Sequence, residues 1–144
     1  MDNYVITIAR GFGSGGKTIG RMLSESLGIP YYDKELIRLA SEESGINEAL
    51  FGKSDEKVKG GIFGKPKRYS GELAKPDSSG FVSEENLFGY QAKVIKSLAD
   101  KGSCIIVGRC ADFVLKDRAD VIKVFIWADM PTCIKNANIV CGLN

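Results

Sequence analysis

The chain has 144 residues, the size of one domain, and its 44% apolar content is enough for a packed core. Its formal net charge of +2 is too small to indicate nucleic acid or an anionic membrane as a partner, and we expect neither. The first residues lack the features of a signal peptide, and no apolar run reaches the ~20 residues of a membrane span. We therefore expect a cytoplasmic protein.

The sequence contains no histidine. This excludes Ser-His-Asp and Cys-His catalysis, histidine zinc sites and histidine general bases. Any proton transfer must use carboxylates, Lys, Tyr or Cys, or the reaction must need little of it. The four cysteines form no Cys-x-x-Cys pair, so we expect reduced thiols and no zinc site.

The first third of the chain alternates between strand and helix patterns. Residues 4–9 form an apolar, β-branched run that is typical of a buried strand, and a glycine cluster follows it. Apolar residues then recur at helical spacing up to Gly28, and a short strand over residues 29–33 ends on a carboxylate. A second helix closes near Gly45. The order of strand, glycine loop, helix and strand predicts a parallel α/β sheet.

Residues 52–80 differ in composition from the rest of the chain. They hold six of the 17 glycines, and residues 52–76 carry seven Lys and Arg against three Asp and Glu, a net charge of 7 − 3 = +4. Such a stretch packs poorly, so we expect a mobile loop.

Regular elements resume after this stretch. Ser83 can cap a helix that carries two glutamates in its first turn and stops at Gly102. Residues 104–107 and 121–127 are apolar runs that predict a third and a fourth strand.

A glycine-rich loop between the first strand and the first helix fits the pattern G-x-x-x-x-G-K-[ST]. In such a loop, backbone N–H groups close around phosphate oxygens, and the helix N-terminus adds partial positive charge. Lys17 would reach the β- and γ-phosphates of ATP, and the Thr18 hydroxyl would ligate Mg²⁺. The eight nucleotide-binding candidates are Gly11, Phe12, Gly13, Ser14, Gly15, Gly16, Lys17 and Thr18.

The same glycines also fit G-x-G-x-x-G, and Asp33 follows at the distance that a dinucleotide-binding fold requires. Lys17 and Thr18 distinguish the two interpretations. A triphosphate with Mg²⁺ uses an ammonium and a hydroxyl there, whereas a dinucleotide fingerprint has no use for them. We therefore favour nucleoside triphosphate binding.

These motifs resemble the cytidylate kinase-like family of P-loop nucleoside monophosphate kinases. The specific blocks are Tyr31-Tyr-Asp33 and Val107-Gly-Arg-Cys-Ala-Asp112. The resemblance implies one three-layer P-loop NTPase domain over residues 1–144, with a parallel 2-3-1-4-5 sheet and helices on both faces. It also implies a mobile acceptor-binding insertion over residues 46–82. The implied reaction moves the ATP γ-phosphate to a nucleoside monophosphate, with CMP or dCMP as the expected acceptor.

The resemblance also implies roles for individual residues. Lys17 and Arg109 would be catalytic, and Arg109 would clamp the acceptor phosphate with its planar fork of donors. Asp33, Arg38 and Asp112 would contribute to the acceptor site. Each has a plain alternative: a cap for the helix that follows Asp33, an exposed helix arginine for Arg38, and a solvated carboxylate for Asp112. The plain alternative for Arg109 is a surface arginine that caps the next helix region.

Two features depart from the family pattern. No acidic residue directly flanks the Gly-Arg pair, and no arginine follows Arg118. We expect the arginine-bearing lid and the fifth strand to be missing, which would expose a sheet edge and favour homo-oligomers. The alternatives are a catalytically impaired nucleotide-binding module or a fragment. A GTPase-like switch is disfavoured because the chain has no Asn-Lys-x-Asp motif.

Overall fold

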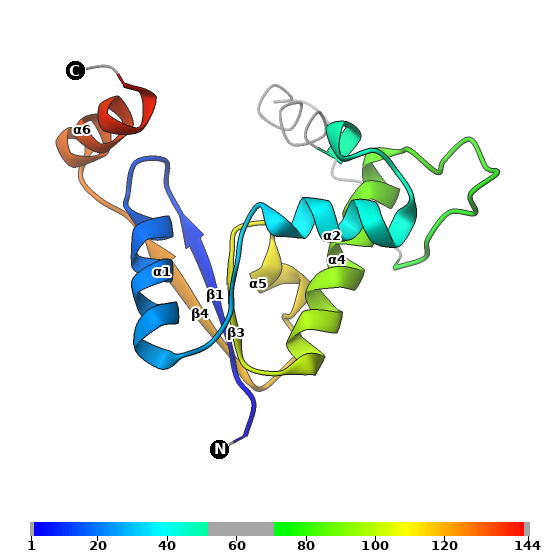
Figure 1. Ribbon diagram of the computed structural model, residues 1–144, viewed down its shortest axis with the longest axis horizontal. Helices are drawn as coiled ribbons and strands as arrows, with labels where there is room; N and C mark the ends of the chain where they lie inside the picture. Colours follow the sequence, from blue (N-terminus) through cyan, green and yellow to red (C-terminus); the bar gives the residue numbers. More distant parts are fainter. Residues whose placement is uncertain (1, 52–70, 143–144) are drawn as a thin grey trace. The chain divides into compact units, whose positions relative to one another are not determined.

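The structure is a computed structural model that describes residues 2–51 and 71–142 (Figure 1). Its chain divides into two compact units, which we describe separately. Unit 1 comprises Met1–Asp33 and Leu98–Asn144, and unit 2 comprises Lys34–Ser97. Within the described ranges, no helix combines the length and the apolar character that crossing a membrane would demand.

Unit 1 is built on a four-stranded parallel sheet in the order β2-β3-β1-β4. The order confirms the predicted α/β fold and its 2-3-1-4 arrangement. The third predicted strand is confirmed at both ends, whereas the second is reduced to two residues. The strands are β1 (Val5–Arg10), β2 (Tyr31–Tyr32), β3 (Cys104–Val107) and β4 (Val121–Ile126).

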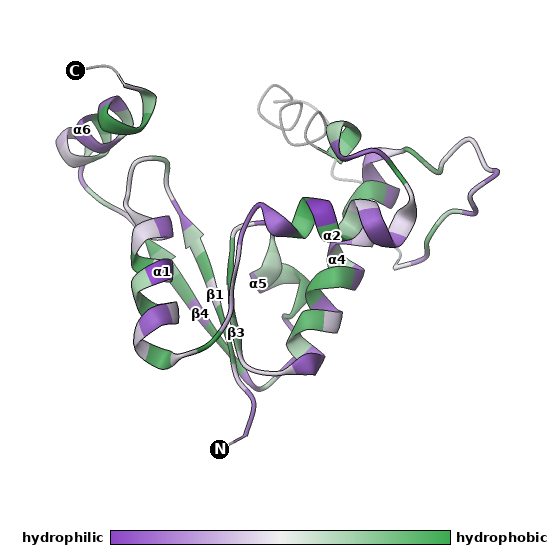
Figure 2. Ribbon diagram, viewed as in Figure 1, coloured by the Kyte–Doolittle hydropathy of each residue, from purple (hydrophilic) through white to green (hydrophobic). Residues whose placement is uncertain are grey.

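The core of unit 1 lies around the two central strands. Val5 to Ile8 of β1 and all of β3 are buried, as expected for strands that are covered on both faces. Ile6, Ile8, Ile105 and Val107 form a cluster against which Leu23 of α1 (Gly16–Leu27) packs. Figure 2 shows the apolar strands beside α1. Gly28 ends α1 in the left-handed conformation, as the sequence predicts.

Two further helices follow the strands of unit 1. The short α5 (Ala111–Val114) follows β3, and α6 (Met130–Cys141) follows β4. Helix α6 is not among the elements expected from the sequence. Its signals were nevertheless present, because the Asp129 side chain caps the Thr132 N–H at 3.0 Å and Pro131 stands in the first turn.

Unit 2 contains α2 (Glu35–Ser44), helical residues 48–51 and most of α4 (Glu84–Lys101). Ser83 caps α4 as predicted: its Oγ accepts the Asn86 N–H at 3.3 Å. The buried Asn86 side chain accepts the Ala74 N–H and donates to the Phe81 carbonyl, both at 2.7 Å. This amide ties the turns over residues 71–83 to the first turn of α4. Residues 52–70 of the predicted mobile stretch lie outside the described residues.

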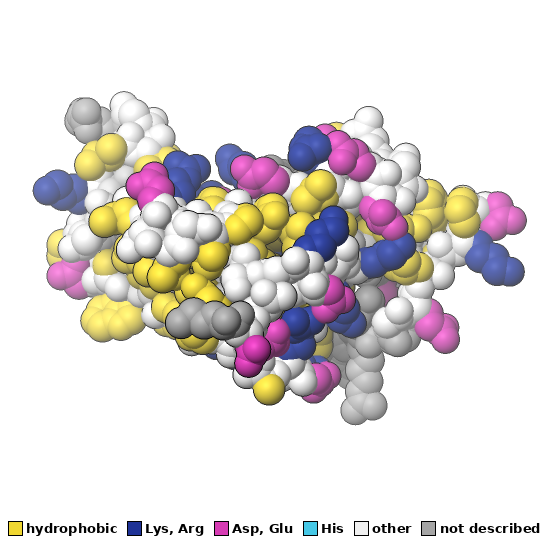
Figure 3. All heavy atoms as spheres, turned by 60° about the horizontal axis from the view of Figure 1, so that its bottom comes forward, with side chains coloured by type: hydrophobic (Ala, Val, Ile, Leu, Met, Phe, Trp, Pro, Cys, Tyr) yellow, Lys and Arg dark blue, Asp and Glu magenta, His cyan; other side chains and the backbone are white. Residues whose placement is uncertain are grey.

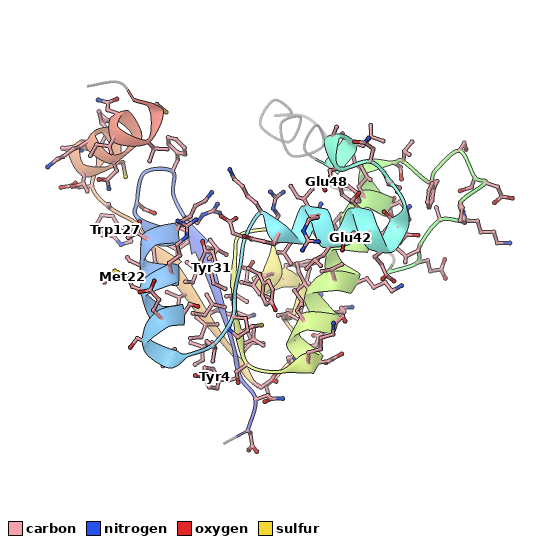
Figure 4. All side chains as sticks on the ribbon, viewed as in Figure 1. Tyr4, Met22, Tyr31, Glu42, Glu48 and Trp127 are labelled. Carbon is pink, nitrogen blue, oxygen red and sulfur yellow. The ribbon has the colours of Figure 1, made fainter. Side chains whose placement is uncertain are left out.

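One edge of unit 1 exposes apolar side chains. β4 is an outer strand of the described sheet, and Phe125 and Trp127 on and after it are 67% and 73% exposed. None of the residues of α6 is buried. Figure 3 shows yellow hydrophobic side chains gathered on the left of the face drawn, and Figure 4 labels Trp127 and Met22 beside α1. The self-association expected from such an edge stays a prediction.

Candidate functional site

The glycine loop joins the carboxyl end of β1 to the first turn of α1. The Gly11 N–H donates to the Ile126 carbonyl at 3.2 Å, which fixes the start of the loop to β4. The buried Ser14 closes the loop on itself, since its Oγ donates to the Gly11 carbonyl at 2.7 Å. Gly15 stands before α1 with a φ of 83°. The loop therefore presents the N-terminus of a twelve-residue helix, whose first N–H groups have no partner within the helix.

Helix α6 contacts the loop directly. The Asn136 amide donates to the Gly13 carbonyl at 2.8 Å. Gly13 has a φ of 75°, and a Cβ added there would lie only 2.4 Å from the Cys133 carbonyl oxygen. Position 13 therefore requires glycine twice over, for its backbone conformation and for the approach of α6.

Lys17 and Asp33 form an ion pair beside the loop. The Lys17 Nζ lies 3.1 Å from a carboxylate oxygen of Asp33, whose side chain is only 9% exposed. The residue before α2 is Lys34, and it makes no side-chain cap. The Asp33 carboxylate thus lies beside the loop, and its acceptor-site role and its role as a helix cap both stay predictions.

Arg109 lies in an unusual turn after β3. Gly108, Arg109 and Cys110 all have positive φ, of 70°, 56° and 53°, and two of them are not glycine. Backbone strain of this kind costs about 1–3 kcal/mol per residue and gathers at functional sites. Burial lowers the pKa of Arg109, the Asp33 carboxylate raises it, and the Arg10 guanidinium lowers it. Arg109 is therefore near both Asp33 and Arg10.

Three of the predicted residues are thus brought together at the carboxyl edge of the sheet. Lys17 follows β1, Asp33 follows β2 and Arg109 follows β3. Ligands of open parallel sheets bind at this edge. The sequence analysis missed Arg10 and Asn136, whose places depend on contacts with segments about a hundred residues away.

Three further candidates have described surroundings of their own. Arg38 belongs to unit 2 and pairs with Glu42 one turn along α2, with both side chains exposed. Asp112 is exposed on α5, and its charge, after burial, raises the pKa of Cys110. Phe12 projects from the loop with 76% of its surface exposed.

The residues of the loop fit a magnesium ion that arrives on a nucleotide. Among the described residues, no three His, Cys, Asp or Glu side chains gather as a metal site. Thr18 is exposed in the first turn of α1, the position from which a hydroxyl ligates Mg²⁺ beside bound phosphates. Mg²⁺ commonly keeps several waters and binds through few protein ligands and the substrate phosphates.

The strand order distinguishes the two glycine-loop interpretations. In the dinucleotide fold the second strand lies next to the first. Here β3 lies between β1 and β2. A parallel sheet in this order, with a lysine-bearing glycine loop after β1, defines the P-loop kinase fold.

The chain belongs to the cytidylate kinase-like family, whose sequence profile matches residues 5–140. No curated protein matches it.

One solved structure similar to this chain is the crystal structure of an uncharacterized protein from Eubacterium ventriosum ATCC 27560. The two are 25% identical, with a TM-score of 0.60 over 98% of this chain. The match covers 63% of that protein, so this chain spans less than two thirds of its length. The similarity supports the fold over nearly the whole chain and brings no activity with it.

Proposed function

We propose that this protein transfers the γ-phosphoryl group of ATP, bound with Mg²⁺, to a nucleoside monophosphate. The observation that carries the proposal is the meeting of Lys17 and Asp33, with Arg109 near Asp33, beside the N-terminus of α1. The loop amides, Lys17 and the helix N-terminus suit the triphosphate of the donor. Arg109 suits the phosphate of the acceptor, because a guanidinium can hold two of its oxygens at once.

The chemistry of this transfer agrees with a chain that has no histidine. The acceptor phosphate is largely a dianion at neutral pH, since its second pKa is about 6. Its oxygen forms the new bond to the γ-phosphorus, the bond to the β–γ bridging oxygen breaks, and ADP leaves with that electron pair. The attacking oxygen has no proton to lose, so no general base is required. The chain has to position the two phosphates and neutralise their charge.

The acceptor that we propose is CMP or dCMP, in line with the family to which the chain belongs. The Thr18 hydroxyl would help to hold Mg²⁺, and the bound ion would supply positive charge against the phosphates. Lys17 is 44% exposed, so its ammonium can reach a phosphate while Asp33 orients it.

The test is transfer of labelled γ-phosphate from ATP across a panel of nucleoside monophosphates. It compares the unmodified protein with Lys17→Ala and with Lys96→Ala, an exposed lysine of α4 in unit 2. We expect transfer to CMP or dCMP that Lys17→Ala lowers at least 100-fold and that Lys96→Ala leaves unchanged. Circular dichroism spectra of both variants are compared with that of the unmodified protein to check that they are folded.

Two outcomes would contradict the proposal in different ways. ATP binding without transfer to any monophosphate would make the protein a nucleotide-binding module. ATP affinity that is unchanged by Lys17→Ala would remove the loop from the binding site altogether.

A further inference from the structure

Arg10 occupies the space between the glycine loop and the turn that carries Arg109. It is the last residue of β1 and is half-buried. A Cβ added at Gly16 would lie 2.6 Å from the Arg10 Cβ, and one added at Gly108 would lie 2.6 Å from its Nη1. The stem of Arg10 therefore passes over the first residue of α1, and its guanidinium reaches the turn before Arg109.

The absence of side chains at both glycines makes this path possible. Any other residue at position 16 would collide with the stem of Arg10, and any other residue at position 108 would displace its guanidinium. Gly108 also has a φ of 70°, which favours glycine on its own. Two segments far apart in sequence thus leave room for the same side chain.

A second guanidinium lies close to Arg10, because the pKa of Arg109 is lowered by burial and also by the charge of Arg10. Within residues 2–51 and 71–142, the Arg10 side chain makes no ion pair and no hydrogen bond, whereas Lys17 is paired with Asp33. Holding like charges together in a half-buried place is unfavourable unless an anion joins them. The cluster is therefore suited to a polyanion.

We propose that Arg10 binds the phosphoryl group in transit between the two nucleotides. The inference rests on the function proposed above and adds a residue to its site. The loop beside the Arg10 stem suits the donor phosphates, and Arg109 beside its guanidinium suits the acceptor phosphate. A guanidinium between them can donate to an equatorial oxygen of the γ-phosphoryl group as the old bond breaks and the new one forms. Arg10 forms no covalent bond and gives up no proton in this step.

An arginine placed on the transferred group can accelerate phosphoryl transfer by about 10³–10⁵-fold. The size of the loss in kcat distinguishes a role of Arg10 on the transferred group from a merely structural role. A residue that only fills the space between two glycines would lower stability when replaced, and it would affect the binding of both nucleotides alike. A residue on the transferred group would affect chiefly kcat and the affinity for a ligand that spans both sites.

The experiment compares Arg10→Gln and Arg10→Lys with Arg21→Gln. Arg21 is an exposed arginine of α1 whose guanidinium lies over the Tyr31 ring, outside the cluster, so it is a matched control. Three quantities are measured: the affinity for ATP with Mg²⁺, kcat for transfer to CMP, and the affinity for a ligand that joins adenosine and cytidine through a pentaphosphate. Thermal unfolding is followed for each variant.

We expect Arg10→Gln to lower kcat at least 100-fold and to weaken the pentaphosphate ligand at least tenfold, while ATP affinity changes less than threefold. Arg10→Lys should restore part of both losses because it keeps the charge, and Arg21→Gln should change neither. Equal weakening of ATP and the pentaphosphate ligand would overturn the proposal, as would an unchanged kcat.

The two proposals fail in distinguishable ways. If the unmodified protein transfers no phosphate, the proposed function fails. The binding arm still decides on Arg10, because an affinity for the pentaphosphate ligand that is unchanged by Arg10→Gln removes Arg10 from the phosphate site whatever the transfer assay shows.

Discussion

The two units of this chain are stabilised in different ways. Unit 1 is joined by backbone pairing between strands distant in sequence, with β1 at its centre between β3 and β4. The described elements of unit 2 are helices and turns, held by buried apolar residues and by side-chain hydrogen bonds such as those of the buried Asn86. The cluster of Arg10, Lys17, Asp33 and Arg109 belongs entirely to unit 1.

This difference explains where sequence motifs were informative. A parallel sheet fixes the carboxyl ends of its strands at one edge, so residues that follow successive strands come together. A helical unit gives no comparable rule for where an exposed side chain acts, and the proposed role of Arg38 in the acceptor site stays a prediction.

The largest expected effect comes from truncating a buried side chain in the core of each unit in turn. Ile105 of β3 and Leu36 of α2 are both fully buried. Truncating either to alanine should lower the free energy of unfolding by about 2–5 kcal/mol. Hydrogen exchange followed by mass spectrometry should show faster exchange in β1 and β4 for Ile105→Ala, and in α2 for Leu36→Ala. ATP affinity should fall more for Ile105→Ala.

Ile105→Val is the matched control, with an expected loss of about 0.5–1.5 kcal/mol. If either alanine variant accelerated exchange equally in both units, the units would unfold as one and the comparison would not hold.

A second test lies in the loop of unit 1. Gly13→Ala places a Cβ on the Cys133 carbonyl in a left-handed backbone, so we expect a loss of stability of about 2–4 kcal/mol and at least tenfold weaker ATP binding. Gly28→Ala is the control, because position 28 also has a positive φ, of 64°, and a Cβ there meets nothing within 4 Å. Isothermal titration and thermal unfolding measure both effects. Equal behaviour of the two variants would remove α6 as a support of the loop.

Much of unit 1 could be predicted because its signals are local. The apolar runs fixed the strands, and Gly28 and Gly45 ended α1 and α2 where expected. The second strand was overestimated, since only Tyr31 and Tyr32 pair with Ile105 and Ile106. The local sequence pattern shows where a chain is extended. It does not show how many of those residues pair with a neighbouring strand.

The parts that could not be predicted depend on distant contacts. No local pattern marks Arg10, because its surroundings include Gly108, which follows it by 98 positions. Asn136 contacts the loop from α6, a helix that is not among the expected elements. Arg109 and Cys110 have positive φ, although Arg and Cys rarely adopt it, so their residue types do not predict this conformation. These positions result from the packing of the fold and carry no sequence motif.

The smallest expected effect is a dependence of stability on pH, and it should differ between the two units. All four cysteines lie in unit 1, and burial raises the pKa of the Cys104 thiol in β3 to about 11, above the ordinary 9.0. The folded state therefore disfavours the thiolate, so this contribution to stability is complete below pH 9 and is lost as the pH rises toward 11. A shift of two pKa units corresponds to about 2.7 kcal/mol.

Cys104→Ala removes the titrating group. The difference in unfolding free energy between the unmodified protein and this variant should shrink by about 2–3 kcal/mol between pH 9 and pH 11, as measured by urea denaturation at each pH. Every other titratable group is common to both proteins, so its contribution cancels in the difference. Hydrogen exchange of the unmodified protein should be measured at pH 8 and at pH 10. The free energy of opening of unit 1 should fall between these pH values by more than that of unit 2. A difference that is constant with pH would mean that the Cys104 thiol ionises as freely in the folded chain as in the unfolded one, and that the core of unit 1 around β3 admits water.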